Sequence, residues 1–378
     1  MILAAAAALV ACSKNEVIPE VVNNDVETEI TYLTAPKVRA DVKDFDKNWN
    51  FKSYAFYLPG TLSWASHEGT DPVAYISDVE VSYNQTDNVW RNETTKYYWP
   101  KSGKLTFFAW TNVREQRGVS GTTYSFSSDD YIKGVTVDAT NGVKIADYDV
   151  TYVDGNTGVG NKNTDVLVAD IKADQTKNLD ANYGTADKRT DAGKFTGVAT
   201  LFKHKLSKVY FTGKTDKDYT ADGIKFYVNS IVFNSVDKKG TYTQGVNASD
   251  CTGSWVTVEN TADAQYYYSG LEGVSGYTIP SDKTVQDIYD TDSQYYYMPQ
   301  TFDDDAEFVV TYSIDYGNGV KEENIKQVCQ LNKSFTGFEI GKFYTINLIF
   351  TLNEILWDPA VEDWEIKNSG DVTVNPTV

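Results

Sequence analysis

The stretch Phe343-Tyr-Thr-Ile-Asn-Leu-Ile-Phe350 is a run of aromatic, β-branched and aliphatic residues with little polar interruption. These residue types favour strands, and a short apolar run of this length is typical of a strand in a protein core. We therefore predict a central core strand here. A second run of the same kind, Leu105-Thr-Phe-Phe-Ala-Trp110, predicts a buried strand in the N-terminal half of the chain.

Shorter segments with strand character are spread over the whole chain and are separated by turn residues such as Pro59-Gly60. They lie at 29–34, 51–58, 79–83, 89–90, 96–99, 165–170, 195–202, 209–212, 224–228, 230–234, 240–243, 295–298, 308–312, 361–366 and 371–374. Short strands at regular intervals predict an all-β sandwich or barrel. Residues 111–163 are rich in Gly, Ser, Asp and Asn, and we predict mostly loops there.

Length and charge limit what the chain can be. Its 378 residues, of which 41% are hydrophobic, suffice for two domains with packed cores. The segment 172–194 is polar and has no apolar period, so it is a candidate connection between them. We predict an N-terminal domain at 29–194 and a C-terminal domain at 195–378. The formal net charge of −19 argues against nucleic acid as a partner, because phosphates require a basic surface.

The N-terminal segment ends in Leu9-Val10-Ala11-Cys12-Ser13 after an almost unbroken apolar run. A run this short cannot span a bilayer, which needs about 20 apolar residues, and is typical of an export signal. Its end resembles the lipobox of bacterial lipoproteins, which implies a signal peptide at 1–11, cleavage before Cys12 and a membrane anchor of acyl chains on that cysteine. By the same resemblance, Ser13 favours the outer membrane. Residues 12–28 are predicted to be a flexible tether, and an ordinary signal peptide is the alternative.

Two further cysteines, Cys251 and Cys329, lie in the C-terminal half. In an exported protein they can form a disulfide. Two buried free thiols agree with the sequence equally well, because pairing depends on the distance between the Cα atoms. Both alternatives stay open.

The sequence lacks motifs of catalysis or metal binding. His67 and His204 lie neither near a cysteine nor four residues apart, so no zinc site is expected, and no phosphate loop, nucleotide fingerprint or nucleophile elbow occurs. We expect His204 to be a partly buried residue bonded to backbone. The segment Asp154-Gly-Asn156-Thr-Gly158 matches a calcium loop only in part, since Val159 stands where such a loop needs Gly. We predict no enzyme activity, no metal and no cofactor.

Two tyrosine clusters, Tyr266-Tyr-Tyr268 and Tyr295-Tyr-Tyr297, bear on ligand binding. They can stack on sugar rings or alternate along core strands, and we favour the core. The run Asp303-Asp-Asp305 is predicted to be a solvated turn.

Several motifs, taken in chain order, resemble the fimbrillin family of Bacteroidales, the Mfa-like and FimA-like subunits of type V pili. The most specific is the pair Asp165-Val-Leu-Val-Ala169 and Phe202-Lys-His-Lys-Leu-Ser-Lys-Val209. The others are the lipobox, Ile30-Thr-Tyr-Leu-Thr-Ala-Pro-Lys-Val-Arg-Ala40, Gly240-Thr-Tyr-Thr243, Met298-Pro-Gln300, Phe338-x-x-Gly341-Lys-x-Tyr344 and Pro359-x-Val-x-x-Trp364. Each motif is weak by itself, but their order is specific. The family usually has Trp where this chain has Phe335 or Phe338.

The resemblance implies two tandem transthyretin-like Greek-key β-sandwich domains and export as a lipoprotein to the outer membrane. It also implies assembly with other pilus subunits by strand exchange. In that scheme an arginine-specific protease cuts between Arg39 and Ala40, and the first strand leaves. Before cleavage, the side chains of Ile30, Tyr32 and Thr34 would fill one face of a groove. After the strand has left, a neighbouring subunit's strand would replace them there.

The C-terminal segment 361–378 bears on the type of subunit. Val372, Val374 and Val378 have a two-residue period and are predicted to form the donor strand of a stem subunit, while tip and anchor roles remain open. Two other functions are alternatives to a fimbrial subunit that supports cell adhesion. One is an outer-surface lipoprotein that binds glycan without polymerising, and the other is a secreted hydrolase with two carboxylates in one cleft.

Overall fold

The computed structural model of the protein describes residues 29–34, 45–67, 69–118, 121–155, 160–176, 197–247, 252–258, 264–270, 272–290 and 292–364. Within these ranges the regular elements are β-strands and three short 3₁₀ helices, and no α-helix occurs. The 3₁₀ helices are η1 (Ser128–Asp130), η4 (Gly273–Ser275) and η5 (Leu331–Lys333). The all-β class predicted from the sequence is confirmed.

A search of the same residues for membrane-spanning segments finds no helix with the length and apolar character that crossing a bilayer requires.

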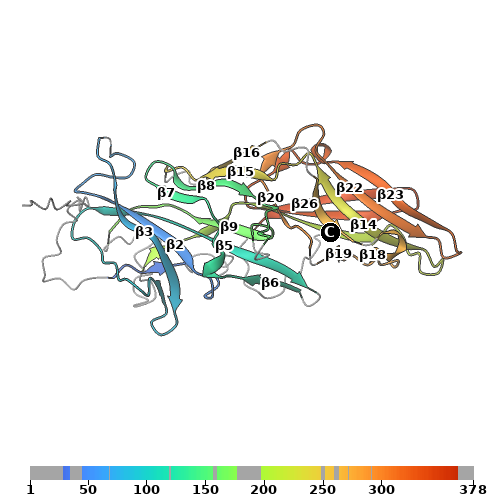
Figure 1. The fold of residues 1–378 in the computed structure, drawn as a ribbon, viewed down its shortest axis with the longest axis horizontal. Helices are drawn as coiled ribbons and strands as arrows, with labels where there is room; N and C mark the ends of the chain where they lie inside the picture. Colours follow the sequence, from blue (N-terminus) through green and yellow to red (C-terminus); the bar gives the residue numbers. More distant parts are fainter. Residues whose placement is uncertain are drawn as a thin grey trace, which may run out of the picture.

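A ten-stranded sheet occupies the N-terminal part of the molecule (Figure 1). Its main path follows the order β11 (Val198–Ala199), β1 (Tyr32–Leu33), β4 (Val89–Arg91), β3 (Val73–Asn84), β2 (Phe51–Leu58), β5 (Lys104–Gly118), β9 (Thr164–Ala169) and β12 (Phe202–His204). Two further strands, β6 (Gly121–Ser125) and β10 (Lys172–Gln175), pair with β5. The β1–β11 pair is parallel, and the other pairs of this sheet are antiparallel.

Neighbouring side chains of β5 enter two different cores. Phe107 packs in one cluster with Phe51, whereas Phe108 packs in a second cluster with Val166. Successive residues of a strand point to opposite faces, so this sheet is buried on both faces at β5. That explains why the run at 105–110 is apolar throughout instead of alternating with polar residues.

A four-stranded sheet covers one of these faces. Its order is β16 (Ser254–Val258), β15 (Lys239–Thr243), β8 (Gly142–Asp149) and β7 (Val135–Asp138). Tyr148 of β8 lies opposite Gly240 of β15, so strands from both sides of the expected boundary at 194/195 share this sheet. β11 and β12 also follow that boundary in the chain but pair with β1 and β9. The division into domains at 29–194 and 195–378 stays a prediction, and strand pairing crosses it at these places.

Two five-stranded sheets form the C-terminal part. One contains β19 (Gln286–Ile288), β13 (Ser207–Thr215), β25 (Lys342–Phe350) and β26 (Ile355–Asp363), with β20 (Tyr296–Tyr297) paired to β13. The other contains β17 (Gln265–Ser269), β14 (Lys225–Asn234), β22 (Glu307–Asp315) and β23 (Lys321–Gln330), with β18 (Tyr277–Ile279) paired to β14. A small two-stranded sheet joins β21 (Gln300–Thr301) and β24 (Gly337–Phe338).

The two five-stranded sheets face each other. The ring of Phe211 on β13 lies 5.8 Å from that of Phe233 and 5.3 Å from that of Phe308, both on the opposite sheet. The run 343–350 is part of β25, which is central between β13 and β26 as predicted. Ile346 and Leu348 are completely buried, whereas Asn347 between them is only partly buried. The strand therefore faces the core of the sandwich with one side.

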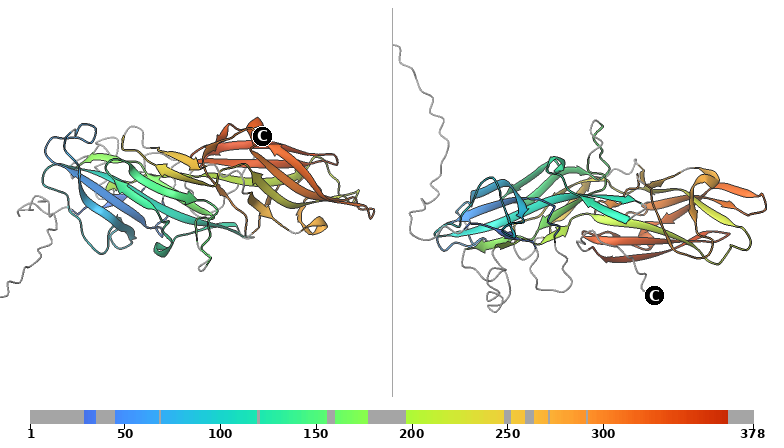
Figure 2. Two further views of the ribbon diagram at one scale, coloured as in Figure 1. Left: turned by 45° about the horizontal axis from the view of Figure 1, so that its top comes forward. Right: turned by 90° about the horizontal axis from the view of Figure 1, so that it is seen from below.

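The molecule is elongated, with the early strands at one end and the orange to red C-terminal sheets at the other (Figures 1 and 2). The strand β5 extends from the N-terminal sheet toward the C-terminal sandwich (Figure 1). Its fifteen residues make the loop prediction for 111–163 wrong over much of that range, because β6, β7 and β8 lie there as well. The charged residues Arg114, Glu115 and Arg117 of this strand are each paired: Arg114 donates to the carbonyl of Gly160, and the other two form ion pairs with the C-terminal sandwich.

Candidate functional site

The segment around β1 is inserted between two other strands. Tyr32 lies opposite Trp90 of β4 on one side and Val198 of β11 on the other. The carbonyls of Thr31 and Leu33 accept hydrogen bonds from the N–H groups of Val198 and Thr200, at 2.8 and 2.7 Å. We call the position of residues 29–34 between β4 and β11 the β1 slot.

Side chains of the segment alternate between buried and partly exposed. Ile30, Tyr32 and Thr34 are 3%, 4% and 8% exposed, whereas the residues between them are half-buried. The ring of Tyr32 meets the edge of Phe51 at a centroid distance of 5.5 Å, and Ser53 donates a hydrogen bond of 2.9 Å to its hydroxyl oxygen. Burial raises the pKa of this hydroxyl well above its ordinary value, so Tyr32 stays neutral. Full burial of such side chains contributes roughly 1.5–3 kcal/mol each.

Gly197, directly before β11, allows that strand to approach β1 closely. Its φ is +145°, and a Cβ atom on it would lie 2.8 Å from the carbonyl oxygen of Thr31 and from the carbonyl carbon of Tyr32. Real Cβ atoms do not approach backbone so closely, so the β1 slot requires glycine at this position.

The remaining residues of the expected assembly machinery lie outside the part of the chain that the structure describes. They are Cys12, Arg39, Ala40, Cys251, Val372, Val374 and Val378, together with the signal peptide at 1–11 and the tether at 12–28. Their roles stay predictions. Cys329 is described, and it is 4% exposed on β23, with no disulfide partner among the described residues. Because Cys251 is not described, a disulfide between the two cysteines stays a prediction. Burial raises the pKa of the Cys329 thiol to about 12.

A second group of residues gathers where the ten-stranded sheet meets the C-terminal sandwich. A 2.6 Å hydrogen bond joins Nδ1 of His204 to the carboxyl group of Asp165, and the imidazole ring stacks on Trp364. The backbone N–H of Trp364 donates to the carbonyl of Gly341, and the N–H of Gly341 donates to that of Leu206. Four motifs that are far apart in the sequence therefore meet in one place. We call this group the junction cluster.

The junction cluster contains a buried ion pair. The ammonium of Lys208 on β13 lies 2.6 Å from the carboxylate of Glu115 on β5, and both side chains are at most 5% exposed. The hydroxyls of Tyr210 and Tyr296 also donate to Glu115. Burial alone lowers the pKa of Lys208, but the nearby carboxylate outweighs this, and the pKa lies well above 10.5. Lys208 therefore stays charged, and removing either partner would leave a buried charge unpaired.

Arg117, near the end of β5, makes further contacts with the C-terminal sandwich. Arg117 forms an ion pair with Asp287, and its guanidinium lies 3.9 Å from the ring centre of Tyr210 and 4.6 Å from that of Tyr289. Contacts of a guanidinium with aromatic faces are favourable, more so where water is excluded. The tip of an N-terminal strand is thus bound between side chains of the C-terminal sandwich.

A short stretch of chain connects the β1 slot to the junction cluster. β11 pairs with β1, and only Thr200 and Leu201 separate it from β12, which ends in His204. The junction residues Glu115 and Arg117 were missed in the sequence, where the apolar pattern of 105–110 stops before them. Both are charged residues in the same strand as the apolar run, and this unusual placement was the signal that could have indicated buried ionic contacts.

The structure corrects the expectation for His204 and agrees with the one for the tyrosine clusters. His204 is buried as a structural residue, but its side chain bonds to Asp165 rather than to backbone. The tyrosine clusters are mainly core, as favoured: Tyr267, Tyr268 and all of 295–297 are at most 5% exposed, and only Tyr266 is exposed, at 53%. Asp165 lies in the junction cluster, and no group of three metal-ligating side chains occurs within the described ranges.

Comparison with known proteins identifies the class. A family model described as fimbrillin-like matches residues 39–364. An alignment with the solved structure of a fimbrial protein from Bacteroides vulgatus ATCC 8482 covers 89% of this chain and 99% of the other, at 14% identity and a TM-score of 0.54. The fimbrial anchor protein Mfa2 from Porphyromonas gingivalis aligns over 89% of this chain and 97% of its own, at 11% identity and a TM-score of 0.28. No curated protein matches.

The match to the family model extends over most of the chain, and the chain belongs to the fimbrillin-like family. This confirms the family predicted from the ordered motifs. The likeness to the Bacteroides vulgatus structure establishes the common fold and, at that identity, the fold alone. The transthyretin-like detail of the two domains stays a prediction. Membership of the family supports the role of a pilus-type subunit at the cell surface.

Proposed function

We propose that the protein is a structural subunit of a type V fimbria, exported as a lipoprotein to the outer membrane and assembled by strand exchange, that supports cell adhesion. It is not an enzyme in this proposal. The observation that carries the proposal is the β1 slot. Residues 29–34 fill it with alternate side chains and precede Arg39 by only a few residues.

Removal of the segment would leave a groove suited to another strand. The N–H groups of Val198 and Thr200 and the carbonyl of Tyr97 would lose their partners, and the pockets of Ile30 and Tyr32 would open. Such an edge, lined by alternating apolar pockets, favours the addition of an extended segment, whose backbone gives affinity and whose side chains give specificity. An edge left open would promote aggregation.

The proposed steps combine the β1 slot with the motifs of the sequence. Lipid on Cys12 would deliver the precursor to the outer membrane. An arginine-specific protease would cut between Arg39 and Ala40 and release residues 29–34. Residues 361–363 belong to β26 and Trp364 to the junction cluster, so only the later part of the predicted donor segment 361–378 can serve as a donor strand. This part of a neighbouring subunit, with Val372, Val374 and Val378, would then enter the β1 slot. The stem role rests on that last step.

The experiment is a protease treatment of the purified protein. We expect an arginine-specific protease to remove the chain before Ala40 and to produce oligomers, measured by mass spectrometry and by size-exclusion chromatography with light scattering. The Arg39→Ala variant should stay monomeric. Arg189→Ala is the matched control, since Arg189 also lies in a polar stretch of sequence, and it should oligomerise like the wild type. A trimmed protein that remains monomeric at high concentration would contradict strand exchange.

A further inference from the structure

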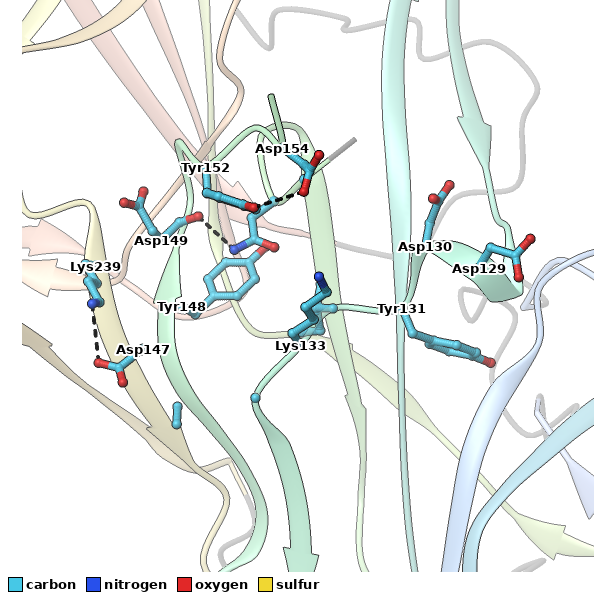
Figure 3. A pocket seen from close by; sticks show the side chains of 15 residues that line it. Asp129, Asp130, Tyr131, Lys133, Asp147, Tyr148, Asp149, Tyr152, Asp154 and Lys239 are labelled. Carbon is cyan, nitrogen blue, oxygen red and sulfur yellow. Dashed lines mark hydrogen bonds and ion pairs between the residues drawn. The ribbon is translucent and has the colours of Figure 1, made fainter. Parts of the chain in front are cut away.

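A hollow of about 760 Å³ lies between β8 and the segment that follows η1 (Figure 3). Ligand sites in proteins commonly have volumes of 300–1,000 Å³. The walls come from residues 129–134, from the end of β8, from 152–154 and 160–161, and from Lys239 of β15. It is remote in the sequence from the β1 slot and shares no residue with it. We call it the Tyr152 pocket.

The polar groups of the Tyr152 pocket include both acceptors and donors. Five carboxylates line it, together with two lysines and the amide of Asn161. Within the part of the chain that the structure describes, the carboxylates of Asp129 and Asp130 and the ammonium of Lys133 have neither a hydrogen bond nor an ion pair. Lys133 lies between the two walls, with its side chain in the hollow (Figure 3).

An aromatic ring forms part of the wall. Tyr152 is 46% exposed, and its hydroxyl donates a 3.3 Å hydrogen bond to Asp154, which fixes the ring across one side of the hollow (Figure 3). A half-exposed tyrosine offers a flat apolar face together with a polar rim. Such a face is suited to the C–H side of a flat, otherwise polar molecule.

The arrangement selects among ligand classes. The carboxylates do not form a metal site, because no described group of three ligating side chains could hold an ion. Five carboxylates against two ammonium groups repel an anion. A purely cationic ligand would be repelled by the unpaired ammonium of Lys133. Hydroxyl groups, which both donate and accept hydrogen bonds, satisfy carboxylates, amide and ammonium at once.

We propose that the Tyr152 pocket binds an uncharged sugar, with one pyranose ring stacked on Tyr152 and its hydroxyls bonded to Asp130, Lys133 and Asn161. A hollow of this size accommodates one or two such rings. Recognition would thus depend on a stacked ring and on neutral hydroxyls, and acidic sugars would be rejected by the surrounding carboxylates.

The test uses the purified protein and saturation-transfer difference NMR with lactose, maltose, cellobiose and sialyllactose. Lactose and sialyllactose are a matched pair, because they differ by one acidic sugar. We expect saturable binding of at least one neutral disaccharide and none of sialyllactose. Tyr152→Ala should weaken that binding about tenfold. Tyr266→Ala, which removes a tyrosine of similar exposure on β17 outside the pocket, should leave it unchanged.

A second pair of variants tests the polar wall. Lys133→Ala should weaken binding, and Lys101→Ala, at another exposed lysine, should not. Failure of all three neutral disaccharides to bind would overturn the proposal. So would equal binding of sialyllactose, or binding that Tyr152→Ala does not change. A lysine tripeptide is measured as a cationic ligand, and its preferential binding would also overturn the proposal. All these measurements are made on the untrimmed protein, so they do not depend on whether strand exchange occurs.

Discussion

The imidazole of His204 lies flat on the indole of Trp364, with ring centres 3.6 Å apart and planes inclined by 7°. Tyr296 stacks on the same indole at 5.2 Å. His204 lies on β12, Tyr296 lies on β20, and Trp364 directly follows β26, so one stack joins three segments that are distant in the sequence. Trp364 is also the last residue that the structure describes, and the predicted donor residues Val372, Val374 and Val378 follow it in the sequence.

Replacement of Trp364 should loosen the junction cluster. Trp364→Ala removes the ring contacts with His204, Tyr296 and Lys208, and we expect a loss of about 2–3 kcal/mol in the free energy of unfolding. Trp364→Phe keeps an aromatic surface and should lose about half as much. Denaturant titration of the three proteins measures this, and equal midpoints for Trp364→Ala and the wild type would show that the stack carries no stability.

The pH dependence of stability should reveal Asp165. Burial raises the pKa of its carboxyl above the ordinary 3.8, although His204 opposes the shift. The folded protein therefore binds this proton more tightly than the unfolded chain. The contribution is fully present below pH 3.8 and is lost as the pH rises through the folded-state pKa.

Asp165→Asn removes this titration while keeping the shape of the side chain. The stability of the wild type relative to Asp165→Asn should therefore increase as the pH is lowered from 7 toward 4, measured by denaturant titration at each pH. Asp165→Ala should be the less stable variant throughout, because it leaves the Nδ1 atom of His204 without a partner. A wild-type advantage that shrinks on acidification would mean that the pKa is lowered and not raised.

Much of the fold and the family could be predicted from the sequence, because alternating strands and ordered motifs are local patterns. The strand at 343–350 and the buried strand at 105–110 are examples. The junction cluster could not be predicted, since Glu115 and Lys208 are 93 residues apart in numbering and meet only through tertiary packing. Likewise, nothing local distinguishes Tyr152, which is exposed in a hollow, from the buried Tyr148 four residues earlier.

Gly197 offers a way to disturb the β1 slot without touching residues 29–34. Gly197→Ala places a Cβ atom against the backbone of Thr31 and Tyr32 and should displace the segment. We expect faster hydrogen exchange in residues 29–34, measured by mass spectrometry. Gly60→Ala is the matched control, because Gly60 also has positive φ, +64°, but open space around it. That variant should lose about 1 kcal/mol of stability and leave the exchange of residues 29–34 unchanged. Equal exchange in both variants would contradict the role assigned to Gly197.

The strand β5 has a mechanical consequence. It begins in the ten-stranded sheet, and its far end is bound by Asp287 and Lys208 of the C-terminal sandwich. Tension along the long axis of the molecule would therefore pull β5 lengthwise past β2 and β9. In that direction the hydrogen bonds of the ladder share the load and must break together, whereas peeling would break them one after another. The protein has the geometry of a tensile element, in which one continuous strand ties the ten-stranded sheet to the C-terminal sandwich.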